Sequence, residues 1–207
     1  MTWIRPTNDL APRALLVGDP GRALALAQQL LDAPLMFNHH RGLWGYTGAA
    51  SDGKPLTIQA TGIGGASAAA VLGDLCELGL RVAVRAGTCR AISATLAPGT
   101  LVAVSAAIAG DGASRALGAA DQVQPDAQLT AALQAAVGHS VVVHSGDLYA
   151  GAVNGGAAVR DLATAAVLQV ARVRGIAAGA VLAVLADDDG PEPVAALGAA
   201  AAAGLGL

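Results

Sequence analysis

The sequence predicts an α/β fold. A single domain, residues 1–207, is expected to form three α/β/α layers around a central, twisted, mixed and largely parallel sheet. Short apolar runs that suit buried strands alternate with alanine-rich runs of helical character. The length of 207 residues fits one domain with a sizeable core, and we find no linker or repeat.

Composition narrows the possible functions. The chain is 54% hydrophobic but only 2% aromatic, so the core must consist of small aliphatic side chains. A net charge of −3, with scattered basic residues, predicts neither a nucleic acid nor a membrane as partner. No signal peptide and no apolar run of ~20 residues is evident. Cys76 and Cys89 lack metal-ligand spacing and suit free, buried thiols, so we expect a cytoplasmic protein.

The first strand is expected at residues 14–17. It runs into G-D-P-G-R, and a helix is expected at residues 23–31. A glycine turn at the start of a helix exposes backbone N–H groups to anions, and Arg22 adds a positive charge there. The turn therefore suits phosphate, with a tight turn and a surface arginine as the alternative.

Two further strands are expected at residues 43–47 and 56–60, after a loop that contains His39 and His40. Adjacent side chains on a strand or helix point apart, so these histidines do not predict a metal site. The turn T-G-I-G-G then opens a helix at residues 68–78. Its glycine spacing does not fit a dinucleotide fingerprint, so NAD is not expected.

The central strand is expected at residues 82–89, which read V-A-V-R-A-G-T-C. Apolar residues on both faces are typical of a buried strand, and Arg85 interrupts them. An unpaired guanidinium would be costly there, so Arg85 must meet either a carboxylate or an anionic ligand. The carboxyl end of such a strand is where open α/β sheets bind ligands.

The second half of the chain continues the alternation. Residues 111–115 are expected to form a loop, and three aspartates at 187–189 a loop before an alanine-rich final helix. The pattern predicts strands at residues 100–107, 141–144 and 179–185, and helices at residues 126–137 and 159–173.

Five segments together resemble the nucleoside phosphorylase family of purine and uridine phosphorylases. They are L-L-V-G-D-P-G-R, R-G-L-W-G-Y-T-G, A-T-G-I-G-G-A-S, V-R-A-G-T-C and S-G-D-L-Y, in family order. The resemblance covers nearly the whole chain and is clearest through Tyr149. It implies cleavage of the N-glycosidic bond of a nucleoside by inorganic phosphate, which yields the free base and ribose 1-phosphate without a cofactor.

The resemblance also implies roles for individual residues. Arg22, Arg85 and Asp187 carry the catalytic roles, with Asp187 protonating the leaving base and Asp188 as a one-residue alternative. An ordinary solvated turn is the other interpretation of these aspartates. The phosphate ligands would be Gly18, Arg22, Arg41, Arg85 and Thr88, and the nucleoside would contact Gly64, Tyr149, Leu162 and Trp3. Arg41 would act across a subunit boundary, which implies a homo-oligomer, either a dimer or a hexameric trimer of dimers.

The chain departs from the family where the sugar binds. The ribose-binding Met-Glu pair aligns with Leu162 and Ala163, and Trp3 occupies the position of a histidine. Asp161 is a poor substitute for the missing glutamate, because on the expected helix it points in a different direction from residue 163. Purine-cleaving relatives also have an arginine after the acidic residue, whereas no Lys or Arg follows Arg174.

Two classes of function remain open. The first is a nucleoside phosphorylase, with purine nucleosides favoured because an aspartate follows the late strand. The second is a catalytically weakened family member that binds phosphate or a nucleoside, or serves as an oligomer subunit. Uridine phosphorylase and hydrolytic nucleosidase are less favoured, the latter because hydrolysis has no need for Arg22 and Arg85.

Overall fold

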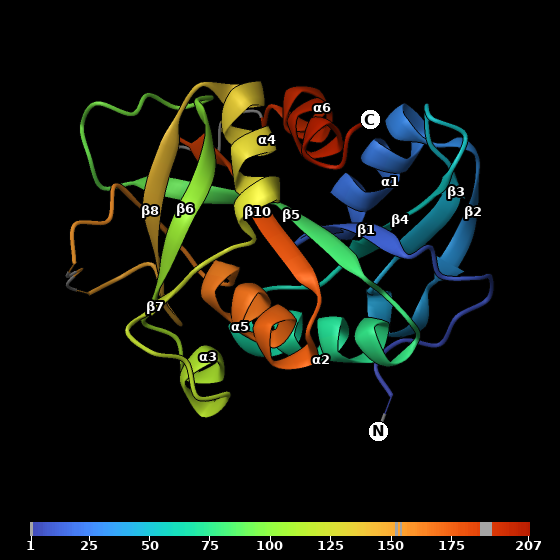
Figure 1. Cartoon of the computed structure of the whole chain (residues 1–207), viewed down its shortest axis with the longest axis horizontal. Helices are drawn as coiled ribbons and strands as arrows, with labels where there is room; N and C mark the ends of the chain where they lie inside the picture. Colours follow the sequence, from blue (N-terminus) through green and yellow to red (C-terminus); the bar gives the residue numbers. More distant parts are fainter. Residues whose placement is uncertain (1, 152, 154, 187–191) are drawn as a thin grey trace.

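The computed structural model describes residues 2–151, 153, 155–186 and 192–207. These residues form one mixed sheet of ten strands, covered by helices (Figure 1). The strands are β1 (Arg13–Val17), β2 (Asp32–Asn38), β3 (Gly45–Ala49), β4 (Pro55–Ala60), β5 (Val82–Ala91), β6 (Leu101–Ala109), β7 (Gln122–Val123), β8 (Ser140–Ser145), β9 (Val159–Asp161) and β10 (Ala177–Leu185). The helices are α1 (Pro20–Leu30), η1 (His40–Gly42, a 3₁₀ turn), α2 (Gly64–Glu77), α3 (Gly112–Ala116), α4 (Ala127–Val137), α5 (Thr164–Arg174) and α6 (Val194–Gly204).

Strand β5 is the centre of the sheet. The strand order is β10-β6-β8-β9-β5-β1-β4-β3-β2, and β10 pairs with β5 as well as with β6. Strands β10, β6, β8, β9 and β5 therefore close into a ring, while β1 and β4 extend the sheet from β5 in parallel. Antiparallel pairs join β4, β3 and β2 at one end and also occur within the ring. The predicted α/β fold with a mixed sheet is confirmed.

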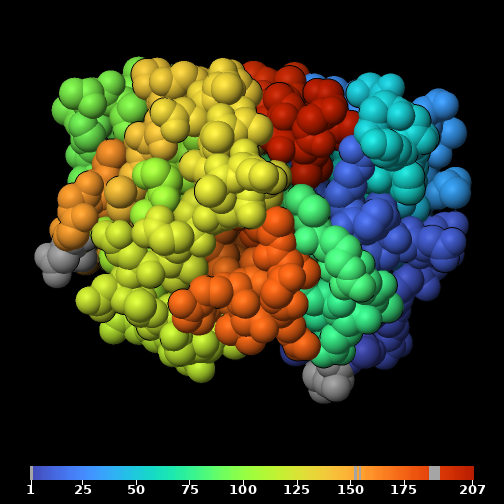
Figure 2. Space-filling view, viewed as in Figure 1, coloured from blue at the N-terminus to red at the C-terminus, as the bar shows by residue number. Residues whose placement is uncertain are grey.

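The helices form two layers. Figure 1 shows α1, α4 and α6 on one face of the sheet and α2, α3 and α5 on the other. Each face has its own core of small aliphatic residues. Helix α6 packs against α4 and α1, and in Figure 2 its red atoms lie between the yellow atoms of α4 and the blue N-terminal segments. No helix of the described residues is long and apolar enough to cross a membrane.

The first helix begins earlier than predicted for a local reason. Asp19 caps α1 by accepting a hydrogen bond from the Arg22 backbone N–H, 2.8 Å away. Pro20 follows in the first turn, where a missing N–H and a fixed φ are tolerated. The predicted helix at residues 23–31 is therefore α1, Pro20–Leu30, and its N-terminus is part of the G-D-P-G-R turn.

Three segments of the structure differ from the prediction. Residues 159–161 are not helical, because V-R-D forms strand β9 between β8 and β5, and α5 starts only at Thr164. Strand β2 was not predicted, since Pro34 lies inside it. Proline is tolerated there because β2 is the edge strand of the sheet. The expected loop at residues 111–115 also contains the short helix α3.

The cysteines are free thiols, as expected. Cys89 lies on β5 and is fully buried, and burial raises the pKa of its thiol above the ordinary range. Cys76 is only partly buried, so the prediction that both thiols are buried is correct for one of them.

Candidate functional site

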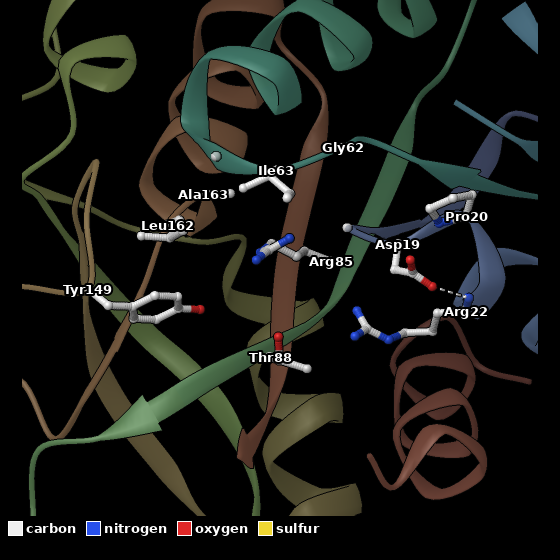
Figure 3. A pocket seen from close by; sticks show the side chains of 12 residues that line it. Asp19, Pro20, Arg22, Gly62, Ile63, Arg85, Thr88, Tyr149, Leu162 and Ala163 are labelled. Carbon is white, nitrogen blue, oxygen red and sulfur yellow. Dashed lines mark hydrogen bonds between the residues drawn. The ribbon is translucent and has the colours of Figure 1, made fainter. Parts of the chain in front are cut away.

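A cavity of about 410 Å³ opens where β1, β4 and β5 reach their carboxyl ends. This is the sheet edge at which ligands bind in α/β folds. Its lining comes from five separate segments of the chain, and Figure 3 shows their side chains around the cavity. The residues that line it are Gly18, Asp19, Pro20, Arg22, Gly62, Ile63, Gly64, Arg85, Thr88, Tyr149, Leu162 and Ala163.

Arg22 forms one wall of the cavity from the first turn of α1. Its side chain is buried, and in Figure 3 the guanidinium extends from α1 toward Thr88. The Arg22 Nε donates a hydrogen bond to Glu192 Oε2 at 3.0 Å, and Nη2 donates a second one to the same oxygen. The alternative of a surface arginine is therefore wrong, because Arg22 is enclosed and paired.

Arg85 lies deeper, on β5. Its Nη2 is 3.0 Å from Asp161 Oδ2, and its Nε donates to Thr164 Oγ1 at 3.1 Å. Asp161 is buried at the end of β9 and also accepts hydrogen bonds from Ser145 Oγ and Thr164 Oγ1, both at 2.6 Å. The sequence predicts either a carboxylate or an anionic ligand as the partner of Arg85. The structure shows a carboxylate, that of Asp161.

Asp161 reaches Arg85 because residues 159–161 form a strand. The expectation that Asp161 points away on a helix is wrong for this reason. Its carboxylate also accepts from the Thr164 backbone N–H at 3.1 Å, just where α5 begins. These donors hold the Asp161 carboxylate in one position, so it fixes Arg85 in turn.

The second glycine turn leads from β4 into α2. Gly62 and Gly64 have φ values of 74° and 84°, which side chains other than glycine rarely adopt. These two residues let the backbone turn at the edge of the cavity, where the N-terminus of α2 begins. Between them, Ile63 is 85% exposed and presents a large apolar side chain at the cavity mouth.

The opposite end of the cavity is mainly apolar. Tyr149 points its ring and hydroxyl inward in Figure 3, beside Leu162 and Ala163. Burial raises the pKa of the Tyr149 phenol, so the hydroxyl is neutral at neutral pH. Arg90 lies over its ring, with Cζ 5.5 Å from the centroid. Ala163 is buried, and its methyl side chain cannot accept a hydrogen bond.

Two predicted site residues lie outside this cavity. Arg41 and Trp3 do not line it but contact each other, with Arg41 Cζ 4.7 Å from the Trp3 ring centroid. Arg41 has a φ of 59°, an uncommon value for a residue with a side chain. Asp187 and Asp188 lie outside the described residues.

Sequence reasoning did not identify the carboxylate partners of the two arginines. From the sequence, Asp161 is expected only as a poor substitute for a sugar-binding glutamate, and no role is expected for Glu192. The sequence holds one signal, because the chain has only two glutamates, Glu77 and Glu192, and Glu192 lies three positions after the last of the three aspartates. The pairings themselves join residues 170 and 76 positions apart, beyond the reach of local patterns.

Comparison with known proteins assigns the chain to a family. The model of the phosphorylase superfamily matches residues 12–204. The chain is 33% identical over 109 residues to the DeoD-type purine nucleoside phosphorylase of Clostridium novyi (strain NT), a match covering 52% of this chain and 46% of that protein. It is 32% identical over 139 residues to the uridine phosphorylase of Treponema pallidum (strain Nichols), covering 67% of this chain and 53% of that protein. The chain thus spans about half the length of the curated relatives it matches.

A solved structure supports the fold. The uridine phosphorylase from Vibrio fischeri ES114 superimposes with a TM-score of 0.85 over 95% of this chain and 91% of that chain, at 21% identity. Relatives with purine and with uridine names match to a similar degree, so the comparisons support the family and not the base. Together with the match over residues 12–204, they show that this chain belongs to the nucleoside phosphorylase family of the phosphorylase superfamily.

Proposed function

We propose that the protein is a nucleoside phosphorylase, which cleaves the N-glycosidic bond of a nucleoside with inorganic phosphate. One observation carries the proposal: Arg22 and Arg85, from two different strand ends, line a single cavity. Guanidinium groups bind phosphate through paired, charge-assisted hydrogen bonds. Gly18 and Thr88, which also line the cavity, complete the proposed phosphate subsite.

In the proposed reaction, a phosphate oxygen forms a bond to the anomeric carbon of the ribose while the bond to the base nitrogen breaks. The electron pair of that bond leaves with the base, which takes up a proton. The sugar is cation-like in the transition state, so the bound phosphate is both nucleophile and counter-charge. Arg22 and Arg85 hold the phosphate in place, and positioning of this kind supplies much of the rate.

We assign the proton to Asp187, which follows β10 in the sequence, and on that basis we favour a purine base. Tyr149 is proposed to contact the base or sugar, since its ring forms the inner wall of the cavity opposite Arg22. Gly64 and Leu162 complete the proposed nucleoside contacts.

We also propose that the working protein is an oligomer. Arg41 and Trp3 lie together, partly or fully exposed, and outside the cavity of their own chain. This arrangement suits residues that complete the cavity of a neighbouring subunit, with Arg41 as a further phosphate ligand.

A second candidate function is a weakened family member that binds phosphate or a nucleoside without efficient turnover. The buried, apolar Ala163 favours it. A glutamate there would accept hydrogen bonds from the ribose hydroxyls, and such a bond to a charged group is typically worth about 1.5–3 kcal/mol.

The two candidates are separated by titrating the protein with phosphate in a calorimeter and then measuring release of free base from inosine, adenosine and uridine. A phosphorylase binds phosphate and releases base only when phosphate is present. Phosphate binding without release from these three nucleosides supports the weakened protein instead. Absence of phosphate binding would contradict the phosphorylase and would leave Arg22 and Arg85 with a structural role only. Sizing of the same sample tests the oligomer, because a strict monomer excludes a cavity shared between subunits.

A further inference from the structure

The carboxylate of Glu192 lies against one of the two arginines that line the cavity. Its Oε2 accepts hydrogen bonds from both Nε and Nη2 of Arg22, and the Glu192 side chain is 34% exposed. These bonds use two of the five N–H groups of the guanidinium. An oxyanion bound by the remaining N–H groups would share the Arg22 guanidinium with the Glu192 carboxylate.

The other charges around the cavity make this carboxylate unusual. Arg85 is neutralised by Asp161, and Asp19 adds another acidic side chain to the cavity wall. Three carboxylates, those of Asp19, Asp161 and Glu192, therefore lie at or beside the two arginines. An anion therefore gains little from net charge here, and its hydrogen bonds must decide whether it binds.

We propose that Glu192 is a specificity-determining residue that makes the anion subsite select a protonated tetrahedral oxyanion, phosphate, over an unprotonated one such as sulfate. The inference rests on the proposed function, because it concerns the phosphate subsite of that function. A carboxylate can only accept hydrogen bonds. Phosphate carries at least one proton at neutral pH and can donate it to Glu192, whereas sulfate has no proton and meets only repulsion.

This selection also orients the phosphate. When the protonated oxygen faces Glu192, the unprotonated oxygens face Arg85 and the interior of the cavity. An unprotonated oxygen is the better nucleophile, so the same contact that rejects sulfate presents the reactive part of phosphate to the sugar.

The test compares calorimetric affinities for phosphate and sulfate in four proteins: wild type, Glu192→Gln, Glu192→Ala and the matched control Glu77→Gln. Glu77 is the only other glutamate and forms an exposed ion pair with Arg174, 3.1 Å away. Wild type and Glu77→Gln are expected to prefer phosphate over sulfate by about tenfold or more, the size of one hydrogen bond to a charged group. Both Glu192 variants are expected to lose most of this preference, chiefly because sulfate binds more tightly.

Three results are informative in different ways. Equal gains for phosphate and sulfate in both Glu192 variants would overturn the inference, since Glu192 would then be a simple competitor for Arg22. That result leaves the proposed function intact. Discrimination that depends on Glu192, without phosphate-dependent base release, would support the inference and contradict the phosphorylase. No phosphate binding by the wild-type protein would overturn both.

Discussion

The two arginines of the cavity have the same chemistry but different surroundings. The Asp161 side chain that pairs with Arg85 is 0% exposed, whereas the Glu192 side chain that pairs with Arg22 is 34% exposed. Asp161 is also held by Ser145 and Thr164. Arg85 is therefore a fixed part of the fold, whereas the Glu192 partner of Arg22 is open to exchange with solvent or with a ligand.

Removal of the two carboxylates should affect stability very differently, and the loss of Asp161 should cost the most of all the changes considered. Asp161→Ala leaves the Arg85 guanidinium buried without its partner, and loss of one member of a buried pair destabilises a protein by about 3–5 kcal/mol. Glu192→Ala removes a partner that is about one third exposed, so the expected loss is about 1 kcal/mol or less. Urea unfolding of both variants measures the difference. Equal losses would show that the two pairs do not differ in the way we describe.

A smaller effect is expected when the space around Arg85 is changed but its charge partner is kept. A Cβ at Gly87 would lie 2.8 Å from Arg85 Cζ and 2.9 Å from Leu182 Cδ2. Gly87→Ala therefore moves the guanidinium or Leu182, at a cost of about 1–3 kcal/mol for overpacking. Because phosphate binding depends on the position of the Arg85 guanidinium, we expect the affinity of Gly87→Ala for phosphate to fall by about tenfold or more, as measured by calorimetry.

Gly73→Ala is the matched control for this variant. Gly73 lies within α2, and an added Cβ would come no closer than 3.8 Å to Arg174 Nη2. Alanine in a helix is about 0.5–1 kcal/mol more favourable than glycine, so this variant should be slightly more stable and bind phosphate normally. An unchanged phosphate affinity in Gly87→Ala would mean that Arg85 does not contact the anion.

The smallest effect is expected at an exposed pair far from the cavity. Arg13 binds Asp52 through both carboxylate oxygens, at 2.9 and 2.6 Å. These hydrogen bonds lower the pKa of Asp52 from 3.8 to about 2. A lowered folded-state pKa contributes stability above 3.8 that is lost as the pH falls toward 2. The difference in melting temperature between wild type and Asp52→Asn should therefore be small at pH 7 and narrow below pH 3.8. A difference that grows in acid would contradict this assignment.

Much of the fold follows from local patterns. The run V-A-V-R-A-G-T-C predicts β5 because its apolar residues fit a strand buried on both faces, and the glycine turns predict where α1 and α2 begin. Strand β9 could not be predicted in this way. Its three residues adjoin a helical pattern, and only pairing with β8 and β5 makes them a strand. Strand β2 was hidden by Pro34, which is tolerated only because no strand pairs on its outer side.

The candidate site is likewise predictable in part from the sequence and in part only from the contacts between distant segments. The resemblance to the family predicts that Arg22, Arg85, Thr88 and Tyr149 lie together, and all four line one cavity in the structure. The carboxylates opposite the arginines were not predictable, because side-chain pairing between distant segments leaves no periodic signal. Whether Arg41 and Trp3 complete a neighbouring cavity stays a prediction, as does the role of Asp187, which lies outside the described residues.

The ring of strands has a consequence for how the protein folds. It closes through β5 and β10, which pair along nine positions although 95 residues separate Val82 from Ala177. Contacts between such distant segments slow folding, because the loop entropy must be lost before the contacts form. The pairing beside Arg85 therefore cannot form until β10 has been synthesised, long after β5. We expect the cavity to be among the last features to form.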